Sequence, residues 1–489
     1  MGHFDISVNI TDPTRQQYSD GADMAIQLFK QVVVRVPAYK KFLAKNKIDP
    51  EKINSHKDFQ KLPFVDKSNY INRYSLEERS WDGKLDAKYI AMSSGSTGKP
   101  HYWARGAAQD EMMVFMLDRM LSIFEADKSQ TLFLNSFGLG AWIAGLELNN
   151  ALKQLTESNS NLTISSPSLD LSVAVRMLEE LAPKFKKVVL AGYPPFVKDI
   201  VTHAKDKGIN LRGLDLRLLT AGEAFSEKWR DGMVNLLEEK DPFHSIINYY
   251  GLAESGTSAH ETPVSIALRR SLAELNKGEV FVRFGGTKTA GLYQFYPRMR
   301  FFEQNNDNVL LLTSPAGLPL VRYYTRDEGG VVDFDEVEQL AGDSYLEYVD
   351  SHANELSKWK LPFVYLFGRT DLSATLYAVN IYVENIKAVL EDPRLSRYTT
   401  GIYIMETKNK RNLDQFLEIQ VELKKNVNKT KTLARKFEAV FVEALRDINT
   451  EYNKLYSSIG KKANPKIVLK GQGSIDYQPG RKHKWVKKD

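Results

Sequence analysis

The pattern of apolar residues between positions 131 and 239 constrains the fold of this chain more than any other feature. Three short apolar runs have the length and composition of buried strands: 131–134, 187–190 and 216–219. Three segments with the spacing of helices separate or follow them: 171–182, 196–207 and 226–239. This alternation of strands and helices predicts an α/β fold.

The segments around this region follow related patterns. Apolar residues at helical spacing predict helices over 24–36, ending near Pro37, and over 112–124. From residue 278 to residue 324 the pattern changes to strands joined by turns, with one strand over 308–313. We therefore expect a large N-terminal domain of mixed sheets and helices over residues 1–367.

The pattern changes again near Gly368. Four apolar residues alternate with polar ones and predict a half-buried strand: Leu417, Ile419, Val421 and Leu423. One amphipathic helix is expected over 430–457, and a further strand over 465–470. Two or three strands with two helices predict a small α+β domain over residues 368–489.

The composition limits the class of protein. A chain of 489 residues is too long for one ordinary core, and 43% apolar with 26% charged residues is typical of a soluble globular protein. No apolar run approaches the length of a membrane span, and the N-terminus lacks the order of a secretory signal. The absence of cysteine excludes disulfides, thiolate metal sites and a cysteine nucleophile. A cytoplasmic enzyme or binding protein fits these limits.

Positive charge is concentrated at the C-terminal end. The formal net charge is +6, yet residues 460–489 hold nine Lys or Arg against two Asp, so the rest of the chain is nearly neutral. A nucleic-acid-binding protein more often spreads a basic face over a folded domain, so no nucleic-acid partner is expected. A solvated, partly disordered end is the alternative to a functional tail.

A loop of hydroxyl, glycine and lysine residues follows the apolar segment 88–92. Its members are Ser93, Ser94, Gly95, Ser96, Thr97, Gly98 and Lys99. Backbone N–H groups and hydroxyls in such a loop can surround polyphosphate oxygens, while the lysine supplies positive charge. The Gly-Lys-Ser/Thr ending of the usual nucleotide loop is missing, so a flexible surface turn is the alternative.

Two further segments contain groups suited to a purine and a metal. The run 218–224 is an apolar strand that ends in small residues and contains Gly222 and Glu223, and the backbone at such a strand end could lie flat against a purine. The run Tyr249, Tyr250, Gly251 precedes Glu254, so a ring could stack on adenine while a carboxylate one turn away takes the magnesium of ATP. An ordinary strand–turn junction and core tyrosines are the alternatives.

Two more segments carry charged residues near the domain boundary. Asp327 lies in the run 323–329 and is suited to two ribose hydroxyls, with an exposed charged turn as the alternative. Arg369 and Asp371 lie in the run 368–371, where a boundary turn would also be charged.

The order and spacing of these five segments resemble the adenylate-forming superfamily of acyl-CoA synthetases, luciferases and peptide-synthetase adenylation domains. The chain is most similar to the phenylacetate–CoA ligase branch, which matches it at 42–67, 250–254, 322–327 and 368–386. The resemblance covers essentially the whole chain. It departs at His101, where the superfamily usually has lysine, at Leu372, where a second acidic residue is frequent, and at Tyr377-Ala378, where Arg-Gly is usual.

The resemblance implies a two-step reaction. A carboxylate attacks the α-phosphate of ATP to give an acyl-adenylate and pyrophosphate, and a thiol, usually that of coenzyme A, then displaces AMP. Residues 93–99 would hold the pyrophosphate, with Thr97 among the catalytic groups. Glu254 would hold Mg²⁺, and Asp327 with Arg369 would hold the ribose.

The resemblance also gives the basic tail a role. Relatives carry a lysine near the C-terminus that reaches the α-phosphate and the carboxylate, and the Lys-x-x-x-Val spacing favours Lys482 for it. Lys484 and Arg481 stay open as alternatives. Asp371 would be the hinge about which the small domain rotates between the two steps.

The substrate is less well defined by the sequence. Phe137, Trp142 and Tyr193 are candidates for the acyl pocket by position and would suit an aryl or other apolar acid, although they could equally be core residues. Transfer to a carrier protein or an amine is an alternative to coenzyme A, and a non-catalytic AMP- or acyl-binding regulator is a second alternative. The identity of the acid and the oligomeric state stay open.

Overall fold

The computed structural model of the chain describes residues 16–93, 101–225, 227–274, 290–352, 358–369, 373–475 and 486. The chain divides into two compact units. Unit 1 comprises residues 1–93, 102–192 and 200–370, and unit 2 comprises residues 94–101, 193–199 and 371–489. None of the described helices is long and apolar enough to cross a membrane.

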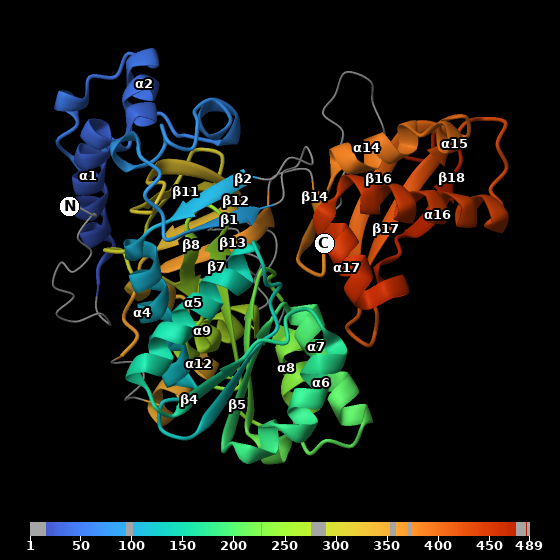
Figure 1. Ribbon diagram of the computed structural model, residues 1–489, viewed down its shortest axis with the longest axis horizontal. Helices are drawn as coiled ribbons and strands as arrows, with labels where there is room; N and C mark the ends of the chain where they lie inside the picture. Colours follow the sequence, from blue (N-terminus) through green and yellow to red (C-terminus); the bar gives the residue numbers. More distant parts are fainter. Residues whose placement is uncertain are drawn as a thin grey trace. The chain divides into compact units, whose positions relative to one another are not determined.

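An eleven-stranded mixed sheet forms the centre of unit 1 (Figure 1). Its parallel half contains, in spatial order, β4 (Leu162–Ser165), β3 (Thr131–Asn135), β5 (Lys187–Gly192), β6 (Leu216–Ala221) and β7 (Ile246–Leu252). Its antiparallel half continues with β8 (Gly256–His260), β9 (Gly291–Gln294), β13 (Phe363–Arg369), β12 (Leu320–Val332), β11 (Val309–Ser314) and β10 (Phe301–Gln304). Every residue of β3 and β5 is buried, as expected for parallel strands covered on both faces.

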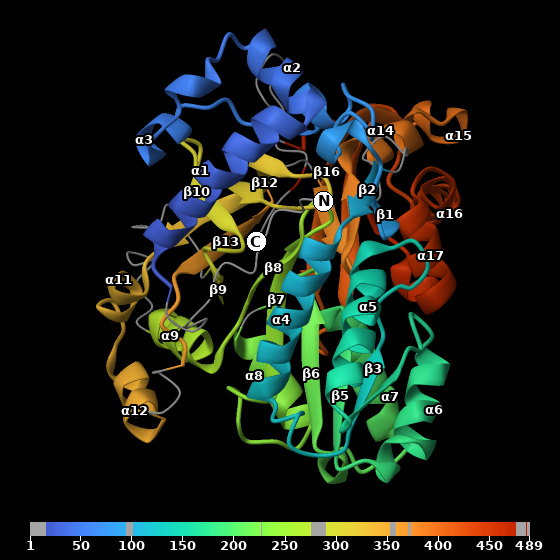
Figure 2. The ribbon, with the colours of Figure 1, turned by 60° about the vertical axis from the view of Figure 1, so that its left-hand side comes forward.

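Helices cover both faces of the parallel half. On one side of β5 and β7 lie α4 (Ala107–Ile123) and α5 (Ile143–Ser158), and on the other lie α6 (Leu171–Glu180) and α8 (Glu227–Leu236), as Figures 1 and 2 show. α7 (Pro194–Asp206) follows β5, α9 (Pro263–Glu274) follows β8, and α11 (Phe334–Glu338) and α12 (Asp343–Ser351) follow β12. α6 begins where the Asp170 carboxylate accepts a hydrogen bond from the Val173 N–H at 3.0 Å.

The N-terminal part of unit 1 is helical and packs on the antiparallel half of the sheet. α1 (Tyr18–Arg35) ends before Val36, and Pro37 starts α2 (Pro37–Lys45), where its missing N–H costs no hydrogen bond. α3 (His56–Phe59) and the strands β1 (Tyr89–Ser93) and β2 (His101–Arg105) follow. One hydrophobic core contains Phe29 and Phe59 from this part together with Phe301 and Tyr323 from the sheet.

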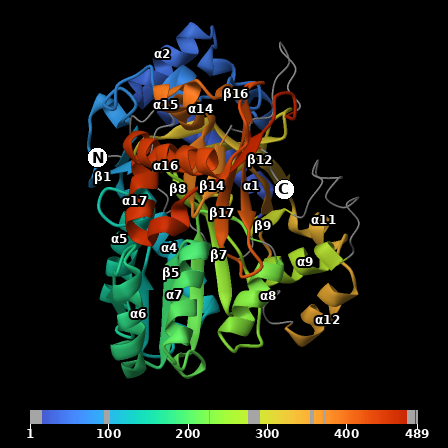
Figure 3. The same ribbon diagram turned by 90° about the vertical axis from the view of Figure 1, so that its right-hand side faces the viewer.

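Unit 2 contains a three-stranded sheet and a two-stranded ribbon. The sheet consists of β16 (Thr399–Asn409), β17 (Gln415–Leu423) and β18 (Lys466–Lys470), and the ribbon of β14 (Ser373–Leu376) and β15 (Val379–Tyr382). α14 (Val383–Glu391), α15 (Pro393–Ser396), α16 (Lys431–Ile448) and α17 (Thr450–Ile459) complete it (Figure 3). Tyr377 and Ala378 both have positive φ, which is the turn geometry of a tight hairpin between β14 and β15.

Short turns of 3₁₀-helix connect several elements: Pro50–Lys52, Trp81–Gly83, Ala182–Lys184, Arg212–Leu214 and Gly460–Ala463.

The structure confirms the α/β class and the predicted strands at 131–134, 187–190, 216–219 and 308–313. The prediction of one helix over 430–457 is wrong, because the chain is extended at Asn449 and the Asn449 side chain caps α17 by accepting the Tyr452 N–H at 2.9 Å. The described part of unit 2 also holds more strands and helices than the sequence predicted.

Candidate active site

Glu254 lies in the short turn between β7 and β8, beyond the carboxyl end of β7. Its side chain is buried, and its Oε1 accepts a hydrogen bond from the Tyr323 hydroxyl at 2.9 Å and lies 3.1 Å from the Lys67 ammonium. Burial alone would raise the pKa of Glu254, but Lys67 and the Tyr323 hydroxyl outweigh it and lower the pKa to about 2. Glu254 is therefore an anion at any physiological pH.

Lys67 reaches this turn because the segment before it pairs with β12. The Val65 N–H donates to the Arg322 carbonyl at 3.2 Å, and the Tyr324 N–H donates to the Val65 carbonyl at 2.8 Å. Lys67 then begins a short helical turn that Asp66 caps by accepting the Asn69 N–H at 2.6 Å. The same strand, β12, thus holds both Tyr323 and the segment that carries Lys67.

Two buried arginines hold the backbone on either side of Glu254. Arg105 donates to the Ala253 carbonyl at 2.5 Å, and Arg300 donates to the Ser255 carbonyl at 2.9 Å. Gln109 also donates to the Ser255 carbonyl at 3.2 Å. These contacts from β2, α4 and the segment before β10 fix the position of the turn.

A second buried carboxylate, Glu147 of α5, lies beside the two arginines. It accepts the Thr257 N–H at 3.3 Å, and a methyl group at Gly256 would lie 2.0 Å from its Oε1. Gly256 also has a φ of +80°, so both its conformation and its neighbour require glycine. Burial raises the pKa of Glu147, and Arg105 and Arg300 offset the rise only in part.

Asp327 and Tyr250 contact each other directly. The Tyr250 hydroxyl donates to Asp327 Oδ2 at 2.5 Å, and the Asp327 backbone pairs with that of Arg369 across β12 and β13. The Tyr250 ring centroid lies 6.1 Å from that of Phe302. The structure therefore brings together Tyr250 and Asp327, which the sequence predicted for adenine and ribose.

Tyr249 and Tyr250 are consecutive residues of the strand β7. The sequence had suggested that the tyrosines lie one helical turn from Glu254. Consecutive side chains of a strand point to opposite faces. Tyr249 is buried with its ring 6.2 Å from that of Phe137, while Tyr250 turns to Asp327. Gly251, the next residue, would place a methyl group 3.2 Å from the Gly256 carbonyl.

Gly222 and Glu223 follow the carboxyl end of β6, the neighbour of β7. Gly222 has a φ of +88°, and the Glu223 carbonyl accepts a hydrogen bond from the Asn248 side chain at 3.0 Å. The carboxyl ends of β6 and β7 lie at the same edge of the sheet, so both groups are at the edge where Glu254 lies. Ligands in open α/β sheets bind at such an edge.

Among the three candidates for the acyl pocket, Phe137 is fully buried and Trp142 and Tyr193 are half-buried. Trp142 lies in the loop between β3 and α5, next to the end of β1, where the Met92 N–H donates to the Ala141 carbonyl at 2.7 Å. Tyr193 directly precedes α7.

No protein-family profile matches the chain. It is 22% identical over 374 residues to the phenylacetate–coenzyme A ligase of Thermus thermophilus. This match covers 74% of this chain and 73% of the relative. A 2-hydroxyisobutyryl-CoA ligase crystallised with 2-HIB-AMP and CoA superposes with a TM-score of 0.65 at 14% identity, over 97% of this chain and 91% of that one. An open conformation of the same ligase gives a TM-score of 0.54 over 96% of this chain and 91% of that one.

The chain has the fold of the adenylate-forming superfamily. This fold confirms the resemblance that the sequence motifs predicted. In this chain, Ser93 ends β1, and its hydroxyl accepts a hydrogen bond from the Trp103 indole N–H of β2 at 2.9 Å. Several predicted residues lie outside the described residues. They are the other loop residues, Ser94, Gly95, Ser96, Thr97, Gly98 and Lys99, the hinge candidate Asp371, and the lysine candidate Lys482 with its alternatives Arg481 and Lys484.

Sequence reasoning missed Lys67, Arg105, Arg300 and Glu147. The segment that ends at Lys67 was recognised as part of the resemblance, but nothing in it indicated that its lysine pairs with Glu254. The arginines and Glu147 carry no motif, and only their burial among polar partners marks them. A charged residue inside an apolar run, such as Glu147 in α5, is the one local signal that could have found them.

Proposed function

We propose that this protein activates a small carboxylic acid with ATP, releases pyrophosphate, and transfers the acyl group from the acyl-adenylate to coenzyme A. The observation that carries this proposal is the buried, ionised Glu254 held by Lys67 and Tyr323 at the carboxyl edge of the sheet. The similarity to a phenylacetate–coenzyme A ligase and to a ligase crystallised with an acyl-AMP and CoA supports the reaction.

Magnesium would enter this site with ATP. Mg²⁺ binds oxygen ligands and is commonly held by one or two carboxylates together with substrate phosphates. Among the described residues no group of three His, Cys, Asp or Glu stands together to hold a metal, and Glu254 supplies one carboxylate. One carboxylate fits an ion that phosphate oxygens also hold, and such an ion would compete with Lys67 for Glu254.

The other predicted residues would bind the nucleotide and the acid. Residues 93–99 would hold the leaving pyrophosphate through hydroxyls and backbone N–H groups. Asp327, positioned by Tyr250, would accept the ribose hydroxyls, with Arg369 beside it, and the backbone at Gly222 and Glu223 would face the purine. Phe137, Trp142 and Tyr193 are the residues proposed to contact the acyl group.

Lys482 would stabilise the charge that develops on the α-phosphate as the carboxylate attacks. Its matched controls are Lys484→Ala and Arg481→Ala, because all three residues lie in the same basic tail. We expect Lys482→Ala to abolish carboxylate-dependent ATP–pyrophosphate exchange while both controls keep it. Exchange retained in Lys482→Ala but lost in Lys484→Ala would move the role to Lys484.

The test of the function is ATP–pyrophosphate exchange across a panel of aryl, fatty and amino acids, followed by addition of CoA. Exchange that depends on an apolar acid, and a thioester after CoA, is the expected result. Exchange without thioester would direct attention to a carrier protein or an amine as acceptor. No exchange with any acid would leave only the AMP- or acyl-binding regulator. A chain without cysteine suits a cytoplasmic site for this reaction.

A further inference from the structure

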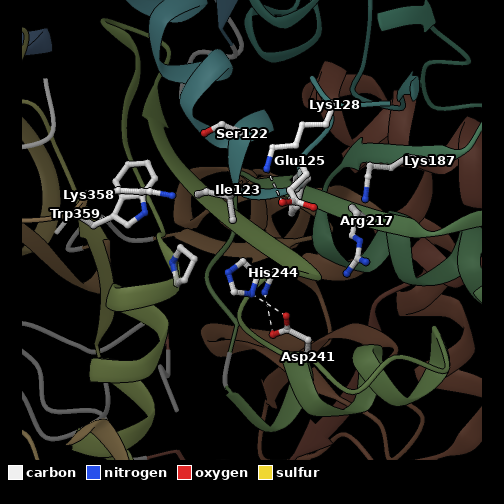
Figure 4. A pocket seen from close by; sticks show the side chains of 12 residues that line it. Ser122, Ile123, Glu125, Lys128, Lys187, Arg217, Asp241, His244, Lys358 and Trp359 are labelled. Carbon is white, nitrogen blue, oxygen red and sulfur yellow. Dashed lines mark hydrogen bonds and ion pairs between the residues drawn. The ribbon is translucent and has the colours of Figure 1, made fainter. Parts of the chain in front are cut away.

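A cavity of about 350 Å³ opens at the other edge of the parallel sheet (Figure 4). Lys187 is the first residue of β5, Arg217 is the second residue of β6, and His244 lies just before β7. Glu254 follows the other end of β7, and seven strand residues span roughly 20 Å. This cavity is therefore separate from the candidate active site.

Positive charge predominates in the cavity wall. Four cations line it, Lys128, Lys187, Arg217 and Lys358, against two carboxylates, Glu125 and Asp241. Asp215, behind Lys187 and Arg217, forms ion pairs with both and leaves an excess of one positive charge. Figure 4 shows these cations entering from different sides, with Lys128 and Lys187 above, Arg217 to the right and Lys358 to the left.

The existing contacts do not use all of the N–H donors. The Arg217 Nε is buried and has no acceptor within the described structure, and its Nη1 donates to the Ser245 hydroxyl at 3.3 Å. Lys187 donates one hydrogen bond, to Asp215, although an ammonium group has three donors. Lys358 forms no ion pair or hydrogen bond with the residues that the structure describes. An anion with several oxygens could accept from all three cations.

Glu125 contributes a carboxylate to the cavity wall, where it pairs with its exposed neighbour Lys128. Its carboxylate lies 2.7 Å from the Lys128 ammonium. Lys128 chiefly, with smaller contributions from Lys187 and His244, lowers the pKa of Glu125. A carboxylate of the chain itself thus already lies in the positive field and would compete with a ligand.

The remaining wall is apolar. Ile123 and Phe124 at the end of α4, Pro263 at the start of α9, and Trp359 contribute it. A volume of about 350 Å³ exceeds what an inorganic anion fills, so a ligand with an organic body would use both the charged and the apolar wall.

We infer that this cavity binds a phosphate monoester, with the phosphate between Lys187, Arg217 and Lys358 and the organic part against the apolar wall. Three cations that approach from separate elements suit a dianion with three terminal oxygens better than a carboxylate with two. This site does not depend on the proposed reaction, since none of its residues belongs to the candidate active site.

The test is isothermal titration of the full chain with AMP, inorganic phosphate and adenosine at constant ionic strength. Because AMP would also bind at the active site, two variant classes separate the sites: Lys187→Met with Lys358→Met for the cavity, and Asp327→Asn for the active site. We expect two AMP sites in the wild type, one of them lost in the cavity variant and retained in Asp327→Asn. We expect inorganic phosphate to bind the cavity about 10-fold more weakly than AMP, and adenosine not to bind there.

Glu125→Gln provides a control of opposite sign. Removing the competing carboxylate should tighten AMP binding in the cavity about 3-fold to 10-fold, whereas Lys358→Met alone should weaken it about 10-fold. Lys358 is exposed, so its substitution should not disturb the fold. Cavity variants whose AMP affinities stay within 2-fold of the wild type at every AMP site would overturn the inference, whereas a single AMP site that is lost in the cavity variant would leave it standing and count against the active site. Equal affinities for AMP and inorganic phosphate would overturn the assignment of an ester.

Discussion

Two buried carboxylates at one turn, Glu254 within it and Glu147 of α5 beside it, have pKa values that shift in opposite directions. Glu254 is 7% exposed and Glu147 is 5% exposed, so burial penalises the charge of both. The pKa of Glu254 nevertheless falls to about 2, whereas burial raises that of Glu147. The two pKa values differ because the cation near Glu254 contacts its carboxylate directly, whereas the cations near Glu147 donate hydrogen bonds to backbone carbonyls.

Lys67 and the Tyr323 hydroxyl both contact one oxygen of Glu254. Arg105 and Arg300, the cations near Glu147, direct donors to the Ala253 and Ser255 carbonyls, and Glu147 itself receives a backbone N–H at 3.3 Å. A direct contact to the charged form lowers a pKa, while cations engaged elsewhere only reduce the cost of burial. The comparison supports the proposal that Glu254 holds a cation and that Glu147 supports the turn.

The largest test of this comparison replaces each carboxylate by its amide. Glu254→Gln should reduce ATP–pyrophosphate exchange about 1,000-fold, equivalent to about 4 kcal/mol of barrier, because the amide cannot replace the anion. Glu147→Gln should keep exchange within about 3-fold, because the amide oxygen can still accept the Thr257 N–H. Equal losses in the two variants would mean that Glu147 also acts through its charge.

Lys67→Met should have the next largest effect, on stability. In the wild type the folded pKa of Glu254 lies below its ordinary value of about 4.3. The ionised Glu254 therefore stabilises the folded state above about pH 4.3, and this contribution is lost as the pH falls toward 2. It amounts to about 3 kcal/mol in the free energy of unfolding at pH 7.

Without Lys67, burial should raise the folded pKa of Glu254 above that of the unfolded chain. The pH dependence of stability then reverses its sign, and the free energy of unfolding of the variant should fall as the pH rises through the raised pKa. Denaturant unfolding between pH 3 and pH 8 measures both curves. Lys52→Met, which removes a surface lysine 3.7 Å from the exposed carboxylate of Asp49, is the matched control and should leave the curve unchanged. Parallel curves for Lys67→Met and wild type would contradict the assigned ion pair.

Arg105→Met tests the support of the turn. It removes the donor to the Ala253 carbonyl, and we expect a loss of about 2 kcal/mol in the free energy of unfolding. Exchange should fall about 10-fold with a rise in the KM for ATP, because Glu254 loses its fixed position. Arg105→Lys should restore part of both. An activity loss without any change in KM or stability would indicate that Arg105 acts on the reaction itself.

Tyr323→Phe should have the smallest effect. It removes one hydrogen bond to Glu254 Oε1 and leaves Lys67 in place, so the free energy of unfolding should fall by about 1 kcal/mol. The pKa of Glu254 should rise but stay below its ordinary value, which an acid-unfolding curve between that of the wild type and that of Lys67→Met would show. A curve that coincides with that of Lys67→Met would assign the low pKa to Tyr323 instead.

Local patterns predicted the parts of the molecule that depend on local physics. The runs at 131–134, 187–190 and 216–219 are strands because a continuous apolar segment of that length must be buried on both faces. The prediction of one helix over 430–457 is wrong at Asn449, where the extended backbone ends α16 and the Asn449 side chain caps α17. Tyr250 and Asp327 were recognised by motif, although only the sheet shows that they touch.

The sequence by itself determined the α/β class, the resemblance to the adenylate-forming enzymes, and Glu254 and Asp327 as candidates. Only the tertiary structure decided the protonation state of each buried carboxylate. A pKa depends on which charges lie within a few ångströms, and β12 brings Lys67 and Tyr323 to Glu254 from distant parts of the chain. The same holds for the cavity at the other edge of the sheet, whose cations carry no motif: parallel pairing of β5 and β6 aligns the ends that carry Lys187 and Arg217, and the fold brings Lys128 and Lys358 to the same cavity from other segments.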